Sequence, residues 1–307
     1  MTKLRIGTRK SKLALWQANY VSERLQSLHS DIQIELIAIT TQGDRQQKLS
    51  LSKEGGKGLF LKELEECLLR DQIDVAVHSM KDVTVSLPIG LHIAAICNRG
   101  DPRDALVSTS SQTLRSLQPG ARVGTCSLRR QCLIKYFTPW VQVRPIRGNV
   151  QTRLERLDRG DFDALVLANV GLQRLGLEHR ATDVIPIENM LPAAGQGAIG
   201  LECRADDQLT NSILESLNDR DTEVRVNAER AANEALNAGC ESPVAFYCEI
   251  DGDILHLRGM VGDPDGQEVI FCEHRGSKAS PKNVGYDLAK KMQKLGAQQI
   301  LNNESSD

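Results

Sequence analysis

The stretch ARVGTCSLRRQCLIKYFTPWVQVRPIRGNVQTRL, residues 121–154, alternates two hydrophobic patterns. Residues 121–125 and 141–146 have the length of strands, whereas the segments that start at Ser127 and Asn149 are typical of helices. A strand–helix–strand–helix order favours parallel strands, because each helix returns the chain to the edge where the next strand begins. The stretch therefore predicts an α/β fold.

The same order extends over the first two-thirds of the chain. We expect strands at 4–9, 33–39, 73–79 and 163–169, and a helix at 12–28. The helix has one apolar face, formed by Ala14, Ala18, Val21, Leu25 and Leu28. Alternation of this kind predicts two doubly wound, parallel sheets with helices on both faces.

The last third of the chain has a different pattern. We expect a helix at 221–237, which Gly239 ends, and a final helix after Pro281. Three strands lie between these helices, and the sequences DGD and DPDG between them favour hairpin turns. The strands cover residues 244–250, 254–261 and 268–275. They predict a small α+β domain with a three-stranded antiparallel sheet.

The composition disfavours several classes of protein. The 307 residues are 40% apolar and 25% charged, as in ordinary globular proteins, and the formal net charge is −2. That charge does not favour a nucleic acid or a membrane surface as partner. The N-terminus lacks an apolar signal segment, and no apolar run is long enough to cross a bilayer. We therefore expect a cytoplasmic protein and, without a coiled-coil pattern or a long apolar face, a monomer.

The eight cysteines are expected to be thiols rather than disulfides in a reducing cytosol. The chain has no CxxC pair and its histidines are scattered, so we expect no metal site. Most cysteines lie in apolar runs and are interpreted as packing residues. Cys240 differs, because it stands in a turn between a helix and a strand, where a thiol has little core to fill.

Charge is distributed unevenly along the chain. Residues 105–154 contain no Asp or Glu, but they contain Arg115, Arg122, Arg129, Arg130, Lys135, Arg144, Arg147 and Arg153. One interpretation is a solvated face whose carboxylates come from elsewhere in the fold. The other is an anion site, because Arg129, Arg130 and Arg147 follow the carboxyl ends of predicted parallel strands, where such sheets bind ligands. Arginine also suits bidentate binding of carboxylates, so we favour the anion site.

Lys81 and Asp82 follow another predicted strand end, in VAVHSMKD. Taken alone, they are typical of a turn. In a cationic site, however, a carboxylate at this position could accept N–H donors, move a proton or stabilise positive charge.

Several motifs, in order along the chain, are shared with one enzyme family. They are IGTRKSKLALWQA, VHSMKDV, DPRDALVS, SLRRQ, IRGNVQTRL, GLQRLGL, LPAAGQGAIGLECR and AGC. From about residue 4 to the C-terminal region, the chain resembles porphobilinogen deaminase, also called hydroxymethylbilane synthase.

The resemblance implies a transferase of tetrapyrrole and haem biosynthesis that joins four porphobilinogen units head to tail, with loss of ammonia, to give linear hydroxymethylbilane after hydrolysis. It implies a dipyrromethane cofactor, attached by a thioether to Cys240, and no metal. It also implies two α/β domains like those of periplasmic binding proteins and a third domain with the cysteine loop. We place domain 1 at 1–97 and 198–216, domain 2 at 98–197, and domain 3 at 217–307.

The resemblance also assigns roles to residues. Asp82 matches the catalytic carboxylate, which hydrogen-bonds pyrrole N–H groups and stabilises the cationic azafulvene formed as ammonia leaves. Cofactor binding is assigned to Cys240, Lys81, Ser127, Arg129, Arg130 and Arg147. Substrate binding is assigned to Arg9, Arg153, Arg174 and Phe60. Because each porphobilinogen carries an acetate and a propionate, a growing chain would need many cations.

Some residues depart from the family pattern, namely Thr84, Cys126, Ala238, Glu241 and Ser242. They leave open a second hypothesis, a binding protein of the same architecture that does not turn its ligand over. A third hypothesis, a nucleic-acid binder, is disfavoured because the aromatic residues of the basic segment are clustered rather than interleaved with the cations.

Overall fold

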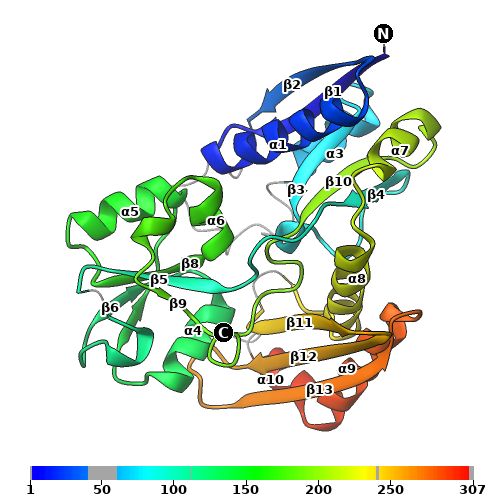
Figure 1. Ribbon diagram of the computed structural model, residues 1–307. Helices are drawn as coiled ribbons and strands as arrows, with labels where there is room; N and C mark the ends of the chain where they lie inside the picture. The colour runs from blue at the N-terminus through cyan, green and yellow to red at the C-terminus, as the bar shows by residue number, and fades with distance from the viewer. Residues whose placement is uncertain (1, 41–60, 111, 240–241, 304–307) are drawn as a thin grey trace. The chain divides into compact units, whose positions relative to one another are not determined.

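The computed structural model describes residues 2–40, 61–110, 112–239 and 242–303, and these form three sheets with helices packed on them (Figure 1). The chain divides into two compact units. The first unit is Met1–Gly100 with Ala198–Glu223, and the second unit is Asp101–Gly197 with Val224–Asp307. Most of the residues predicted as domains 2 and 3 fall in the second unit, and the three-domain division stays a prediction.

The first unit holds a five-stranded sheet of order β2-β1-β3-β10-β4. The strands are β1 (Thr2–Arg9), β2 (Ile32–Ile39), β3 (Val75–Ser79), β4 (Leu91–Ile96) and β10 (Ile199–Arg204). The helices are α1 (Lys12–Leu28), α3 (Lys62–Leu69) and α7 (Gln208–Glu215). Val75 packs in the core that α1 covers, whereas the next residue, Ala76, packs in the core that α3 covers. The sheet is therefore covered on both faces, as predicted.

The second unit holds a five-stranded sheet of order β7-β6-β8-β5-β9. The strands are β5 (Asp104–Ser108), β6 (Arg122–Gly124), β7 (Gln142–Arg144), β8 (Ala164–Ala168) and β9 (Asp183–Val184). The helices are α4 (Leu128–Phe137), α5 (Val150–Asp158) and α6 (Asn169–Arg174). Leu133 of α4 packs on one face of the sheet, and Leu154 of α5 and Leu172 of α6 pack on the other. The doubly wound α/β class is confirmed.

Two strands correct the expectation of wholly parallel sheets. β10 runs antiparallel to β3 and β4, and β5 runs antiparallel to β8 and β9. Each of these strands follows a strand of the other sheet without an intervening helix. Parallel neighbours need a crossover connection, and neither β5 nor β10 arrives by one.

The predicted C-terminal antiparallel sheet is confirmed, with strands β11 (Val244–Asp251), β12 (Ile254–Gly262) and β13 (Val269–Ser277). It packs with α8 (Arg220–Ala235), α9 (Pro281–Lys294) and α10 (Ala297–Asn303), the last of which the sequence pattern did not predict. Phe246 belongs to that core, whereas its neighbours Ala245 and Tyr247 pack in the core of α4. The sheet therefore has apolar contacts on both faces.

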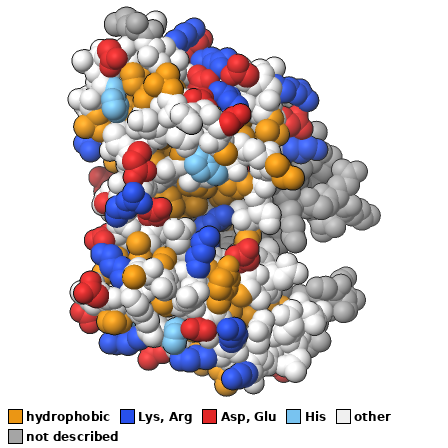
Figure 2. Space-filling model, turned by 90° about the vertical axis from the view of Figure 1, so that its right-hand side faces the viewer, with side chains coloured by type: hydrophobic (Ala, Val, Ile, Leu, Met, Phe, Trp, Pro, Cys, Tyr) orange, Lys and Arg blue, Asp and Glu red, His pale blue; other side chains and the backbone are white. Residues whose placement is uncertain are grey.

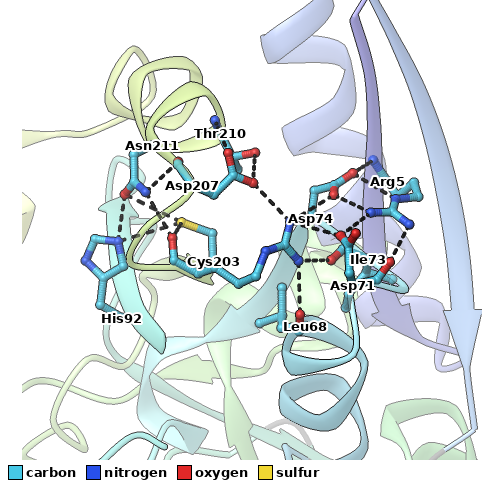
Figure 3. A network of polar contacts seen from close by, with 11 residues as sticks. Arg5, Leu68, Asp71, Ile73, Asp74, His92, Cys203, Asp207, Thr210 and Asn211 are labelled. Carbon is cyan, nitrogen blue, oxygen red and sulfur yellow. Dashed lines mark hydrogen bonds and ion pairs between the residues drawn. The ribbon is translucent and has the colours of Figure 1, made fainter. Parts of the chain in front are cut away.

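A polar network joins the end of β10 to its neighbours in the first unit (Figure 3). Arg204 donates hydrogen bonds to the carbonyls of Leu68 and Ile73 and to the carboxylates of Asp74 and Asp207. Arg5 of β1 binds the same Asp74 through two guanidinium nitrogens and its backbone amide. Burial by itself would raise the pKa of Asp74, but the hydrogen bonds and charge of Arg5, with a hydrogen bond from Arg204, lower it. Among the described residues, no helix is long and apolar enough to cross a membrane.

Candidate active site

In the first unit, two candidates lie just beyond the carboxyl end of β3. The strand ends at Ser79, and a single 3₁₀ turn, Met80–Asp82, follows it. Met80 is buried and its amide donates to the carbonyl of Ala198 at 3.0 Å, whereas Lys81 is half-buried and Asp82 is exposed. A buried residue thus anchors the turn and leaves the Asp82 carboxylate accessible.

Arg9 lies at the same edge of the sheet. It is the last residue of β1, which is parallel and adjacent to β3, with Gly7 opposite Ala76. Parallel neighbours end at the same edge, so the structure brings Arg9, Lys81 and Asp82 to one side of the first sheet.

In the second unit, three adjacent parallel strands, β7, β6 and β8, lead into α5, α4 and α6. Ser127 caps α4 and Asn149 caps α5, each accepting from a backbone amide three residues later. Five candidates lie at this edge or in the first turn of a helix there: Ser127, Arg129, Arg130, Arg147 and Arg153. Arg174 ends α6 and donates to the carbonyl of Gly197 at 2.8 Å. Arg129, Arg130 and Arg147 thus follow the carboxyl ends of parallel strands, as the sequence predicted, whereas the roles assigned to all these residues stay predictions.

Arg129 and Arg130 are buried, with 3% and 6% of their surfaces exposed, and they share one carboxylate. Asp104 accepts from Arg129 at 2.8 Å and from Arg130 at 2.7 Å. Their other terminal nitrogens donate to the carbonyls of Leu191 and Val166. Burial by itself would raise the pKa of Asp104, but the two guanidinium groups outweigh it and hold that pKa well below its usual range.

This buried cluster retains positive charge, because one carboxylate neutralises one of the two guanidinium groups. Gln196, which is 1% exposed, adds only a neutral donor to Asp104 at 2.9 Å. In the described part of the chain, the Nε atoms of Arg129 and Arg130 have no hydrogen-bond partner. A buried positive charge with unused donors favours an anionic ligand.

Arg153 and Arg147 add cations to the same edge. Burial, and then the nearby charge of Arg130, lower the pKa of Arg153. Its Nε donates to the carbonyl of Gly148, and Arg147 is exposed in the loop before α5. Among the described residues, no carboxylate forms an ion pair with either arginine.

The solvated-face interpretation holds for other cations of the acid-free segment. Arg122 pairs with Asp163, and Lys135 pairs with Asp265. On the face drawn in Figure 2, Lys and Arg side chains are interspersed with Asp and Glu. The basic segment thus divides into a solvated set and a set at the strand ends.

Comparison with known proteins identifies the family. The model of "Porphobilinogen deaminase, dipyromethane cofactor binding domain" matches residues 4–212, and that of "Porphobilinogen deaminase, C-terminal domain" matches residues 224–294. The chain belongs to the porphobilinogen deaminase family. Members are transferases of tetrapyrrole biosynthesis, and dipyrromethane is the family cofactor.

Solved structures with partial likeness include the aliphatic sulphonate binding protein SsuA from Escherichia coli. It is 13% identical, with a TM-score of 0.43 over 77% of this chain and 71% of that chain. The methionine binding protein MetQ is 12% identical, with a TM-score of 0.45 over 76% and 94%. YhfZ from Shigella flexneri is 18% identical, with a TM-score of 0.39 over 75% and 94%.

The residues of the second unit fit dipyrromethane, which carries the acetate and propionate groups of two linked porphobilinogen units. The cluster of Arg129, Asp104 and Arg130 has one cation in excess, and Arg147 and Arg153 add two more. Carboxylates are the groups that guanidinium donors match best. The sequence pattern missed Asp104 and Gln196, because neither stands in a charge run or a periodic pattern.

The structure describes the chain on either side of Cys240. Cys240 and Glu241, like Phe60 of the other candidates, lie outside the described residues. The helix before the loop ends at Ala235, and Asn237, with a φ of 52°, takes the left-handed conformation that we expected of Gly239. Ser242 accepts from the amide of Gly239 at 3.1 Å. The serine that departs from the family pattern thus contacts Gly239, at the edge of the described residues.

Proposed function

We propose that this protein is an active hydroxymethylbilane synthase, which condenses four porphobilinogen units head to tail and releases the linear tetrapyrrole by hydrolysis. The observation that carries the proposal is the buried cluster of Arg129, Asp104 and Arg130, with its excess cation and unused Nε donors. Every porphobilinogen unit carries two carboxylates, so a site of this kind suits both substrate and product.

The arginines bind and orient in this proposal. Arg129 and Arg130 are held by a buried carboxylate and by carbonyls, so their charges are fixed before a ligand arrives. Fixed charges do not reorganise during the reaction, which makes them effective. Arg147 and Arg153, which are not committed to carboxylates in the described part of the chain, bind acetate and propionate groups, as do Arg9 and Arg174.

Asp82 acts on the reacting ring. The C–N bond of the aminomethyl group breaks, and nitrogen leaves as ammonia with the bonding electrons. The cation that remains is stabilised by the carboxylate, which also accepts the pyrrole N–H. A C–C bond then forms to the free α carbon of the preceding ring, and that carbon loses its proton to Asp82 or to water. Lys81, beside it in the turn, binds a carboxylate of the ring.

The cofactor has one role in this proposal: it supplies the first free pyrrole α carbon when bound. Cys240 is the proposed thioether anchor. Its described neighbours, Gly239 and Ser242, follow α8 and precede β11, and the Ser242 hydroxyl accepts from the Gly239 amide.

Turnover separates this proposal from a binding protein without catalysis. With porphobilinogen, the purified protein should release one ammonia for each unit incorporated and form hydroxymethylbilane. Asp82→Asn should retain the cofactor but lower kcat on the order of 100-fold or more, because proton transfer and charge stabilisation are both lost. Asp206→Asn, an exposed aspartate of the same unit, is the control and should be as active as the wild type. Near-normal turnover by Asp82→Asn would exclude its proposed role.

A further inference from the structure

A buried histidine–carboxylate pair lies four residues before Asp82. The Nε2 atom of His78 on β3 lies 2.7 Å from Oε2 of Glu202 on β10. The two side chains are 3% and 1% exposed. A buried carboxylate is costly unless it is hydrogen-bonded, so the partnership with His78 stabilises Glu202 in this position.

Besides the backbone pairing of β3 with β10, three further contacts hold the end of β3, and the histidine–carboxylate pair is one of them. Side chains alternate across a strand, and His78 points to the α3 face, where it meets Glu202, whereas Ser79 points to the α1 face. There Ser79 accepts from Gln17 of α1 at 2.8 Å. The third attachment is the Met80 amide, which donates to Ala198 just before β10. The last two residues of β3 and the first residue of the turn are thus each fixed by a different neighbour.

β10 also restricts Met80 sterically. Gly200 lies opposite His78, and a Cβ atom placed on it would come within 2.1 Å of the Met80 sulfur. The absence of a side chain at Gly200 lets Met80 pack tightly on the strand. Displacement of β10 would therefore shift the turn that carries Lys81 and Asp82.

A third titratable group faces the pair. Burial raises the pKa of Glu65 on α3, the charge of Glu202 raises it further, and His78 opposes both. Among the described residues, the second oxygen of Glu202 has no hydrogen-bond partner. The carboxylate is thus committed to a single partner, His78.

We propose that His78 and Glu202 are positioning residues for Asp82, holding the end of β3 on β10 so that the carboxylate meets the reacting ring in one orientation. The inference rests on the proposed role of Asp82. Neither residue touches substrate in this account; both act through the turn.

The alternative is that His78 and Glu202 only stabilise the fold. A second polar contact beside β10 provides a control for this alternative. On the opposite face of β10, Cys203 contacts His92, and His92 Nε2 lies 2.6 Å from the side-chain oxygen of Asn211. The contact between His92 and Asn211 joins β4 to α7 (Figure 3), and in the described part of the chain neither side chain is hydrogen-bonded to the turn Met80–Asp82. Asn211→Ala should lower thermal stability and leave kcat unchanged.

The test compares holoenzyme variants at a temperature where circular dichroism shows all of them folded. Glu202→Ala should lower kcat 10- to 100-fold, because small misplacements of a catalytic group have effects of this order, and leave KM for porphobilinogen within about twofold. Glu202→Gln keeps an oxygen acceptor for His78 and should recover most of kcat. If Glu202→Ala does not fold, the kcat of His78→Gln provides the same test.

Two results would overturn the proposal: kcat of Glu202→Ala or His78→Gln within twofold of wild type, or Glu202→Gln as slow as Glu202→Ala with both folded. Asp82→Asn in the same series keeps the two proposals apart. If Asp82→Asn is inactive and Glu202→Ala is normal, only the positioning role fails. If Asp82→Asn turns over normally, the proposed function of Asp82 fails.

Discussion

Asp104 holds Arg129 and Arg130 in place by an ion pair with each. It is fully buried, and both carboxylate oxygens accept from guanidinium groups. The acid-free segment that drew attention to Arg129 and Arg130 starts at the very next residue, Ala105. The pattern predicted the cations and their strand ends, but only the fold brings Asp104 and α4 together.

Asp104→Asn should lower the free energy of unfolding by about 3 kcal/mol at neutral pH, because two guanidinium groups would stay buried without a carboxylate. The loss should depend on pH. The folded pKa of Asp104 lies below the unfolded value of roughly 3.9. Its contribution is therefore present above the unfolded pKa and is lost as pH falls through the folded pKa.

Urea denaturation of wild type and Asp104→Asn between pH 7 and pH 3 measures this. The difference in the free energy of unfolding between the two proteins should stay constant down to about pH 5 and become smaller below about pH 4. A difference that becomes larger on acidification would contradict the stabilisation that we assign to the buried ion pair.

At the scale of elements, the two five-stranded sheets have the same plan. Their orders, β2-β1-β3-β10-β4 and β7-β6-β8-β5-β9, place the antiparallel strand fourth in each. No sequence repeat predicted this likeness. Apolar periodicity predicts that a segment is a strand but not its direction, which depends on where the preceding element ends. For the same reason, most helices and strands were predicted, but the antiparallel direction of β5 and β10 was not.

The hairpin turn between β12 and β13 contacts α4, the helix that carries Arg129 and Arg130. A Cβ atom on Gly266 would lie 2.7 Å from the backbone oxygen of Cys132 and from the amide nitrogen of Tyr136. Gly252, in the turn between β11 and β12, also has a positive φ, but nothing lies within 4 Å of its Cβ position. The two glycines share a positive φ and differ in whether a side chain would have room, so their alanine variants can be compared directly.

Gly252→Ala should lower the free energy of unfolding by about 1 kcal/mol, the cost of a left-handed alanine. Gly266→Ala should lower it by a further 1–3 kcal/mol or so, because the turn must also move off the α4 backbone. Chemical denaturation of both variants gives the comparison. Equal losses would mean that the turn does not bear on α4.

At the scale of the whole molecule, family membership and three-sheet organisation agree with the sequence-based expectations. Arg9, Lys81 and Asp82 belong to the first unit, and Arg129 and Arg130 belong to the second. Compartment and oligomeric state stay predictions, because near-neutral charge and the surface pattern restrict them only weakly. The anchor at Cys240 was inferred from motif resemblance, since a single cysteine in a turn has no distinguishing pattern of its own.

The most direct test of the account is the intact mass of the purified protein, made in cells that supply porphobilinogen. We predict a wild-type mass that exceeds the sequence mass by one dipyrromethane unit. Cys240→Ser should remove that excess, whereas Cys126→Ser, a change at an exposed thiol, should retain it. A wild-type protein at its sequence mass, or an excess that persists in Cys240→Ser, would contradict the account.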